Sequence, residues 1–223
     1  MKPTVIVLVL VTQLAISNCS SSAGRLIGIN RRVDESIETA NNINVEERRT
    51  FFEIEKASIG NASFEGMTVL GLDSLRRSRG CRLIREDTRD TYVVHLGFGF
   101  LHFFFKRLNM DGNSFSATFK IPWNSFVLVF TTTWEPCDFK MERLYIERAW
   151  DIWLQAARPG SSGQALDPFF KNEVIPKINA VLDVYRHHVE ELMRERYCEK
   201  KQFPNEENHF QKVLLDFLLN IIL

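Results

Sequence analysis

The sequence predicts an α+β fold in which an antiparallel β-sheet wraps around a long C-terminal helix. Apolar residues alternate with period two through the middle of the chain, whereas helical spacing occurs near both ends, so strands and helices are segregated. The C-terminal apolar stripe is long enough for a helix of about 25 residues, or roughly 40 Å. A helix of that length exceeds what one ordinary core needs, which favours a sheet that wraps it lengthwise.

A first helix is predicted over Leu26–Asn44. Its apolar residues recur at i, i+3 and i+4, and charged residues occupy the other faces. This amphipathic helix needs an apolar partner in the folded protein.

The segment Tyr92–Phe105 is predicted to be the central strand. Gly97 and Gly99 on one face leave room for a close neighbour or a sharp bend. Nine of the 18 phenylalanines lie between Phe98 and Phe130. The other face is bulky and apolar, and it carries Val94, Leu96, Phe98, Phe100 and Phe104, with His102 among them.

Further strands are predicted on both sides of this segment. Phe51–Ile59 and Phe64–Leu72 form one broken strand, or two strands around Gly60-Asn61. An Asp-Gly pair at the centre of Asn109–Asn113 predicts a hairpin. The remaining strands are predicted over Phe115–Ile121, Phe126–Trp134 and Cys137–Trp153.

Two helices are predicted at the C-terminal end. Asp167-Pro168 matches the residues preferred at a helix start, and Pro176 either kinks this long helix or marks where it begins. Residues 204–223 form a final apolar helix that is too short to span a membrane. It would dock on the body, cap a cavity or touch a membrane surface.

The N-terminus reads as a secretory signal over residues 1–23. Lys2 precedes a short apolar run, and small polar residues follow, so cleavage after Ser17 or after Ala23 is expected. We therefore expect a secreted, extracellular protein with a single domain over residues 24–203 and the apolar helix over 204–223.

Secretion favours a disulfide among the cysteines. Cys81 and Cys137 both flank strands, and a Cys81–Cys137 bridge is the preferred pairing. Buried free thiols are the alternative, since connectivity cannot be read from spacing. Asn61 lies in an Asn-Ala-Ser acceptor sequence and is a predicted glycosylation site.

The charge balance gives no case for nucleic-acid binding. Lysine and arginine total 28, aspartate and glutamate total 28, and the net charge is +0. Leu72–Gly80 is nevertheless rich in arginine. It is either an anionic headgroup site or, as we favour, a solvated turn balanced by nearby carboxylates.

No catalytic pattern stands out in the sequence. There is no Gly-x-Ser-x-Gly elbow and no phosphate-binding glycine loop, and the histidines do not cluster. His95 and His102 fall on opposite faces of one strand. We therefore expect a non-enzymatic protein without a catalytic residue, cofactor or metal site.

Several segments carry a resemblance to a known group. FEGMTVLGLDSLRRSRGCRLIRED, YVVHLGFGFLHFFFK, a glycine hairpin, a strand opening at Cys137 and LDPFFKNEVIPKINAVLDVYRHHVEELM resemble the mite group 7 allergen-like proteins of arthropods. That group is similar to the bactericidal permeability-increasing protein and lipopolysaccharide-binding protein, and to the takeout and juvenile-hormone-binding proteins (the TULIP superfamily). The resemblance spans about Leu26–Tyr197 and implies a highly curved sheet wrapped around the long helix, with lipid binding and no catalysis. Cys137, Cys198 and the tail after Pro204 depart from that pattern.

These observations predict a binding protein for lipid or another hydrophobic molecule in an elongated apolar cavity. The alternative functions are recognition of microbial or membrane lipid surfaces and, with no nucleophile and base identified, hydrolysis. For each phenylalanine, ordinary core packing competes with a lining role. The predicted lining is Leu96, Phe98, Phe100, Phe119, Leu128, Phe130, Ile178, Leu182 and Tyr185.

Overall fold

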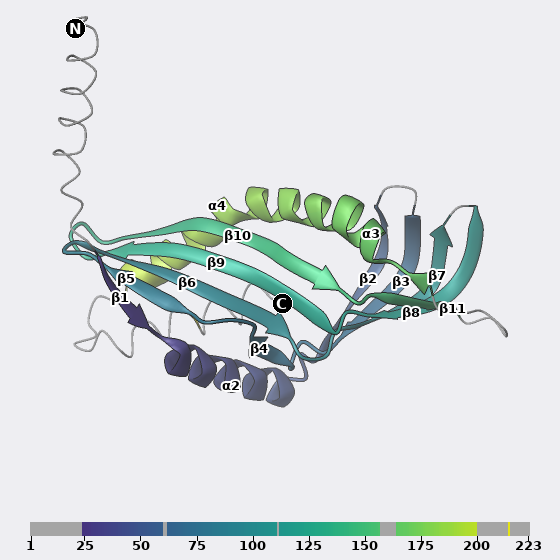
Figure 1. The fold of residues 1–223 in the computed structure, drawn as a ribbon, viewed down its shortest axis with the longest axis horizontal. Coiled ribbons are helices and arrows are strands. Elements are labelled where there is room, and N and C mark those ends of the chain that lie inside the picture. The colour runs from purple at the N-terminus through teal and green to yellow at the C-terminus, as the bar shows by residue number, and fades with distance from the viewer. Residues whose placement is uncertain (1–23, 60–61, 111, 157–163, 200–213, 215–223) are drawn as a thin grey trace, which may run out of the picture.

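The computed structural model describes residues 24–59, 62–110, 112–156, 164–199 and Leu214. It combines helices with two antiparallel sheets, and a C-terminal helix lies against one of them (Figure 1). The predicted signal peptide and the glycosylation site Asn61 lie outside the described residues, as does the apolar helix over 204–223 except for Leu214. Leu214 is helical and fully buried.

The first sheet has the strand order β1-β5-β6-β9-β10, with β4 also paired to β6. All of its pairings are antiparallel. Its strands are β1 (Arg25–Gly28), β4 (Leu75–Arg77), β5 (Arg82–Arg85), β6 (Arg89–Phe98), β9 (Trp123–Thr133) and β10 (Asp138–Trp150).

The second sheet has the order β12-β11-β8-β7-β3-β2, and it too is antiparallel. Neither sheet closes on itself among the described strands. The strands of the second sheet are β2 (Phe51–Ile59), β3 (Ala62–Leu70), β7 (His102–Met110), β8 (Asn113–Lys120), β11 (Trp153–Ala156) and β12 (Gln164–Ala165).

The predicted continuous strand Tyr92–Phe105 is divided between the two sheets. β6 ends at Phe98 and β7 begins at His102. Two glycines permit the close backbone contacts around this break. A Cβ on Gly71, which has φ +99°, would lie 1.6 Å from the Phe100 carbonyl oxygen, and one on Gly97 would lie 2.3 Å from that of Asn124.

The N-terminal segment begins as a strand, because β1 occupies Arg25–Gly28, and α2 spans Asn30–Glu46. Leu26, predicted to start the helix, is exposed, whereas Val33, Ile37 and Ala40 are buried. The amide side chain of Asn41 accepts from the Leu75 N–H and donates to its carbonyl, which ties α2 to β4.

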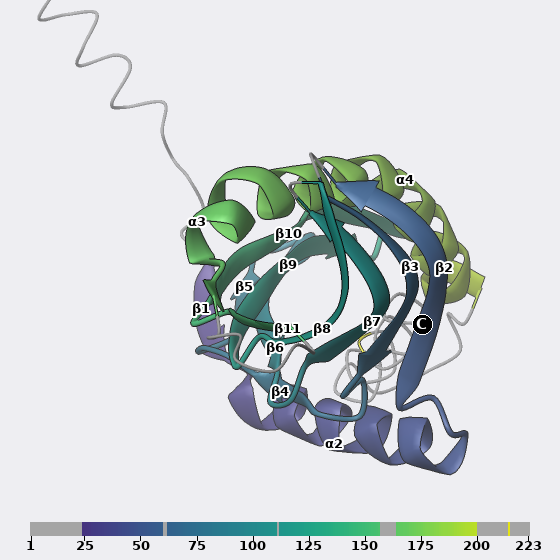
Figure 2. The same ribbon diagram turned by 90° about the vertical axis from the view of Figure 1, so that its right-hand side faces the viewer.

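The C-terminal helix starts in three parts. A turn at Asp167–Phe169 (α3) leads into a π-helical stretch at Phe170–Val174 (η1), and α4 then runs over Ile175–Glu199. Pro176 is the second residue of α4, which directly follows the π-helical stretch, so it lies where the hydrogen-bonding pattern of a continuous helical segment changes. The helices α4 and α2 lie on opposite sides of the strands (Figure 2).

Side chains of α4 satisfy backbone groups of β10, the edge strand of the first sheet. Asn179 accepts a hydrogen bond from the Ile146 N–H at 2.7 Å and donates to the Ile146 carbonyl at 3.0 Å. Glu190 accepts from the Met141 N–H, and Arg186 donates to the Met141 carbonyl. Because unpaired edge groups are costly to bury, these contacts fix the position of α4 along the sheet.

A disulfide joins Cys137, which precedes β10, to Cys198 near the C-terminal end of α4. It links α4 covalently to the strand against which the helix packs. The predicted Cys81–Cys137 bridge is therefore wrong: Cys81 is a buried free thiol. Sequence spacing gave no access to this pairing, because it depends on where the end of α4 meets the start of β10. No helix among the described residues is long and apolar enough to cross a membrane.

The buried apolar residues form two clusters. The first joins α2, the first sheet and the C-terminal half of α4, and Leu214 belongs to it. The second joins the second sheet to Leu166, Phe170 and Val174 at the start of the C-terminal helix. The candidate site lies mainly in the region of the second cluster.

Candidate apolar cavity

A cavity with an apolar lining has a volume of about 620 Å³. This lies within the range of about 300–1,000 Å³ typical of small-molecule sites. Its walls come from β2, β3, β7 and β8, from the adjoining ends of β6, β9 and β10, and from the stretch Leu166–Val181.

Alternation in the strands explains why this wall is apolar. Phe103 and Phe105 of β7 point inward, as do Phe64 and Met67 of β3, while His102 and Phe104 lie on the other face. The start of the C-terminal helix forms the wall of the cavity that faces the second sheet, and it contributes Phe170, Val174 and Ile178.

The wall is braced by ring contacts. Phe119 stacks on Phe103 with ring centroids 4.7 Å apart and on Phe105 at 5.0 Å. Phe170 meets Phe119 edge-on at 5.3 Å, which connects the helical stretch to the sheet. Such aromatic pairs stabilise by more than their buried area alone.

The cavity presents no free polar group. Among the residues that the structure describes, Asn124 and Ser125 are the polar ones that line it, and none of its lining residues is charged. The Asn124 amide is committed to the backbone of Phe98 and Ile121. The Ser125 hydroxyl bonds to Ser78 and Glu147. A molecule held here would be bound by apolar burial rather than by directed hydrogen bonds.

The cavity reaches the surface where its large lining side chains are exposed. Phe52 of β2 is 37% exposed and Val181 of α4 is 56% exposed. Val184, one turn further along α4, is 75% exposed and does not line the cavity.

Three of the nine predicted lining residues, Phe98, Phe119 and Ile178, do line this cavity. Leu96, Leu128 and Phe130 are instead fully packed in the first cluster, and Leu182 packs against it. Phe100 and Tyr185 do not line this cavity, and they are 47% and 60% exposed. The break between β6 and β7 turns Phe100 outward, and Tyr185 lies on the solvent side of α4.

Sequence reasoning missed the lining contributed by β3 and by the inward face of β7. The signal was present in the alternation of Phe103 and Phe105 with His102 and Phe104. The inward-facing residues of β7 were assigned to the wrong face of the sheet. The prediction treated residues 92–105 as one unbroken strand, so the alternation of β6 was continued into β7 without allowing for the break.

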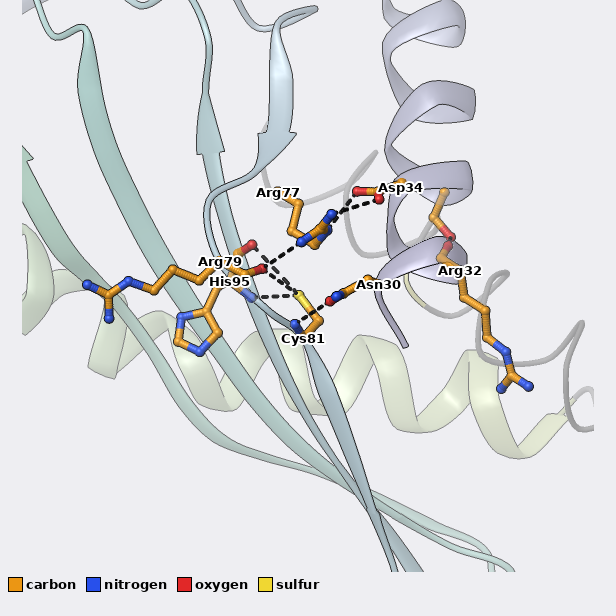
Figure 3. Close-up of polar contacts among 8 residues, drawn as sticks. Asn30, Arg32, Asp34, Arg77, Arg79, Cys81 and His95 are labelled. Carbon is orange, nitrogen blue, oxygen red and sulfur yellow. Dashed lines mark hydrogen bonds and ion pairs between the residues drawn. The ribbon is translucent and has the colours of Figure 1, made fainter. Parts of the chain in front are cut away.

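The arginine-rich turn does not line the cavity, although Ser78 within it bonds to the lining residue Ser125. Several arginines of this region are paired with carboxylates. Arg77 forms a two-pronged ion pair with Asp34 of α2, with N···O distances of 2.8 and 3.0 Å (Figure 3). Arg79 pairs with Glu147, and Arg85 pairs with Asp90. These contacts support the solvated-turn interpretation, because the guanidinium groups already have carboxylate partners.

Cys81 sits beside this turn without a catalytic arrangement. Its sulfur lies 3.3 Å from the backbone nitrogen of His95, and the His95 ring points away from it (Figure 3). Burial raises the pKa of the Cys81 thiol, and burial lowers the pKa of His95. A protonated thiol is a poor nucleophile. No metal-ligating cluster is found among the described residues.

No family model matches this chain, and no curated protein matches it.

Proposed function

We propose that this protein binds a lipid or another hydrophobic molecule, without catalysis, in the cavity between the second sheet and the start of the C-terminal helix. The observation that carries the proposal is a void of about 620 Å³ whose polar lining side chains, within the described part of the chain, are already hydrogen-bonded in the protein. An apolar guest would gain about 0.8 kcal/mol for each methylene group it buries there.

The resemblance to the mite group 7 allergen-like proteins and their lipid-binding superfamily belongs to this proposal. In such an arrangement the two sheets would act as one curved wrap, with α4 lying along its seam. The contacts of Asn179, Arg186 and Glu190 with β10 support that role for α4, because they hold the helix along one edge of the wrap.

Extracellular residence is part of the same proposal. The Cys137–Cys198 disulfide is consistent with an oxidising compartment. Recognition of lipid surfaces through the arginine-rich turn receives less support, because Arg77, Arg79 and Arg85 are engaged by carboxylates.

The test uses protein that cultured cells secrete. Its bound lipid is extracted with organic solvent and identified by mass spectrometry. Phe103→Gln places an amide in the cavity wall and should reduce the lipid recovered per protein. Phe104→Gln changes the neighbouring residue, which is 41% exposed and outside the cavity, and should leave recovery unchanged. Recovery of no apolar molecule, together with failure to bind an added fluorescent fatty acid, would contradict the proposal.

A further inference from the structure

A second apolar feature lies on the outside of the molecule, where the two sheets meet. Four aromatic residues, which we call the aromatic surface, are strongly exposed: Phe100 at 47%, Trp123 at 50%, Trp150 at 41% and Trp153 at 53%. They include three of the four tryptophans in the chain. Exposed apolar side chains that gather in one patch mark interaction surfaces, whereas single exposed ones are common.

The rings are held in place rather than free. Trp123 and Trp150 are cross-strand partners in β9 and β10, and their rings stack at 6.4 Å with an interplanar angle of 16°. The Trp153 indole N–H donates to the Asp151 carboxylate at 2.9 Å. The Phe100 ring lies 3.9 Å from the His102 ring.

Basic side chains border the aromatic surface. The Arg76 guanidinium lies 5.8 Å from the centre of the Trp123 ring, and that of Arg148 lies 5.5 Å from the Trp150 ring. Arg76 also donates to the Pro122 carbonyl. The exposed Lys120 is in register with Trp153 across β8 and β11. The nearby carboxylates are Asp151, which accepts from Trp153, and Glu147, which is 3.8 Å from Arg148 and also pairs with Arg79.

The aromatic surface adjoins the wall of the apolar cavity. A groove of about 480 Å³ on this side is lined by Phe100, His102, Lys120, Asp151, Trp153 and Gln155. Leu101 and Phe119 border both this groove and the internal cavity. Only a thin layer of side chains therefore separates the two.

We propose that the aromatic surface docks this protein onto anionic phospholipid bilayers. Tryptophan is favoured at the boundary between headgroups and acyl chains, where its apolar body and its N–H are both accommodated. Arg76, Lys120 and Arg148 are placed to meet lipid phosphates beside the inserted rings. Docking itself requires no guest in the cavity. That the docked bilayer supplies the guest rests on the proposed function.

The four tryptophans allow a direct test of orientation. Trp134 directly follows β9 and is separated from Trp123 by up to about 36 Å at the rise of an extended strand. Its ring centroid is 6.0 Å from that of Tyr197. Trp134→Phe leaves only the surface tryptophans, whereas the triple variant Trp123→Phe, Trp150→Phe and Trp153→Phe leaves only Trp134. Both are mixed with vesicles of phosphatidylserine and bromine-labelled phosphatidylcholine, because bromine quenches tryptophan fluorescence on contact.

The proposal expects strong quenching of Trp134→Phe and little quenching of the triple variant. The reverse pattern, or no quenching of either, would overturn it. Arg76→Ala should weaken vesicle binding about fivefold at low salt, and Val184→Ser, on the exposed side of α4, should leave it unchanged. Dimerisation that is lost in the triple variant, with no vesicle binding, would assign the surface to a second copy of this chain and overturn the bilayer assignment.

Failure of docking and failure of ligand binding are separable. Vesicle binding is measured on protein stripped of lipid, and ligand binding is measured without vesicles. Quenching by vesicles in a protein that binds no fatty ligand would leave docking intact and contradict only the proposed function.

Discussion

Filling part of the cavity should shorten the longest ligand that fits, rather than abolish binding. Ala149 of β10 lines the cavity, and the described residues around it there are apolar or uncharged. The substitution Ala149→Phe should therefore place an aromatic ring inside the cavity. A benzene-sized ring needs a space of about 150 Å³, and a group the size of a water molecule takes about 30 Å³. The ring would remove about a quarter of the 620 Å³ cavity, or room for about five methylene groups.

The consequence is measurable with a series of straight-chain alcohols. At about 0.8 kcal/mol per buried methylene, affinity should rise about fourfold for each added carbon until the cavity is full, and then level off. Ala149→Phe should move the plateau to chains about five carbons shorter, which lowers the affinity for the longest alcohols by up to about a thousandfold. Short alcohols should bind as before.

The assay is displacement of a fluorescent fatty acid by each alcohol from octanol to tetracosanol, because a cavity of 620 Å³ holds about 20 methylene groups at about 30 Å³ each. Val184→Phe adds a ring to the exposed side of α4 and is the matched control, with an unchanged plateau expected. Equal plateaus in Ala149→Phe and the native chain would refute the assignment of the cavity as the binding site. Affinity independent of chain length in the native chain would refute the apolar binding mechanism itself.

Other perturbations probe the frame around the cavity. Replacing Cys137 and Cys198 by serine opens a loop with a sequence separation of 61 and should lower the free energy of unfolding by about 4 kcal/mol, measured by denaturant titration. Asn179→Ala strands the N–H and carbonyl of Ile146 and should cost about 1–3 kcal/mol in the same assay, whereas Asn179→Asp, which retains the acceptor, should cost less. Burial lowers the pKa of His95, as do Arg79 and Arg82, against an opposing effect of Glu147. The unfolded chain therefore takes up this proton first, so stability should fall as the pH drops below about 6.5. His95→Gln should flatten that decline in the unfolding free energy, and an unchanged pH dependence would contradict the assignment.

The strand pattern was readable because alternation is a local property. Phe51–Ile59 and the hairpin around Gly112 were both predicted from local sequence, and both occur. The division at residues 99–101 was not readable, because it depends on the close approach of Gly71 to the Phe100 backbone, a contact between distant parts of the chain. That one break reversed the assignment of Phe100 and hid the inward position of Phe103.

Whether an apolar sheet face is filled or hollow was also beyond the sequence, because it depends on the volume that the opposite layer supplies. Over the first sheet, α4 supplies Val189, Met193 and Tyr197, and these pack solidly against it. Over the second sheet the covering side chains come from the shorter stretch Phe170–Val181, which leaves the cavity. Enlarging one residue in that stretch should therefore convert cavity into core: Ile178→Phe should raise the unfolding temperature while it lowers ligand capacity. A variant that lost both would show instead that the wall at this position is already packed to its limit.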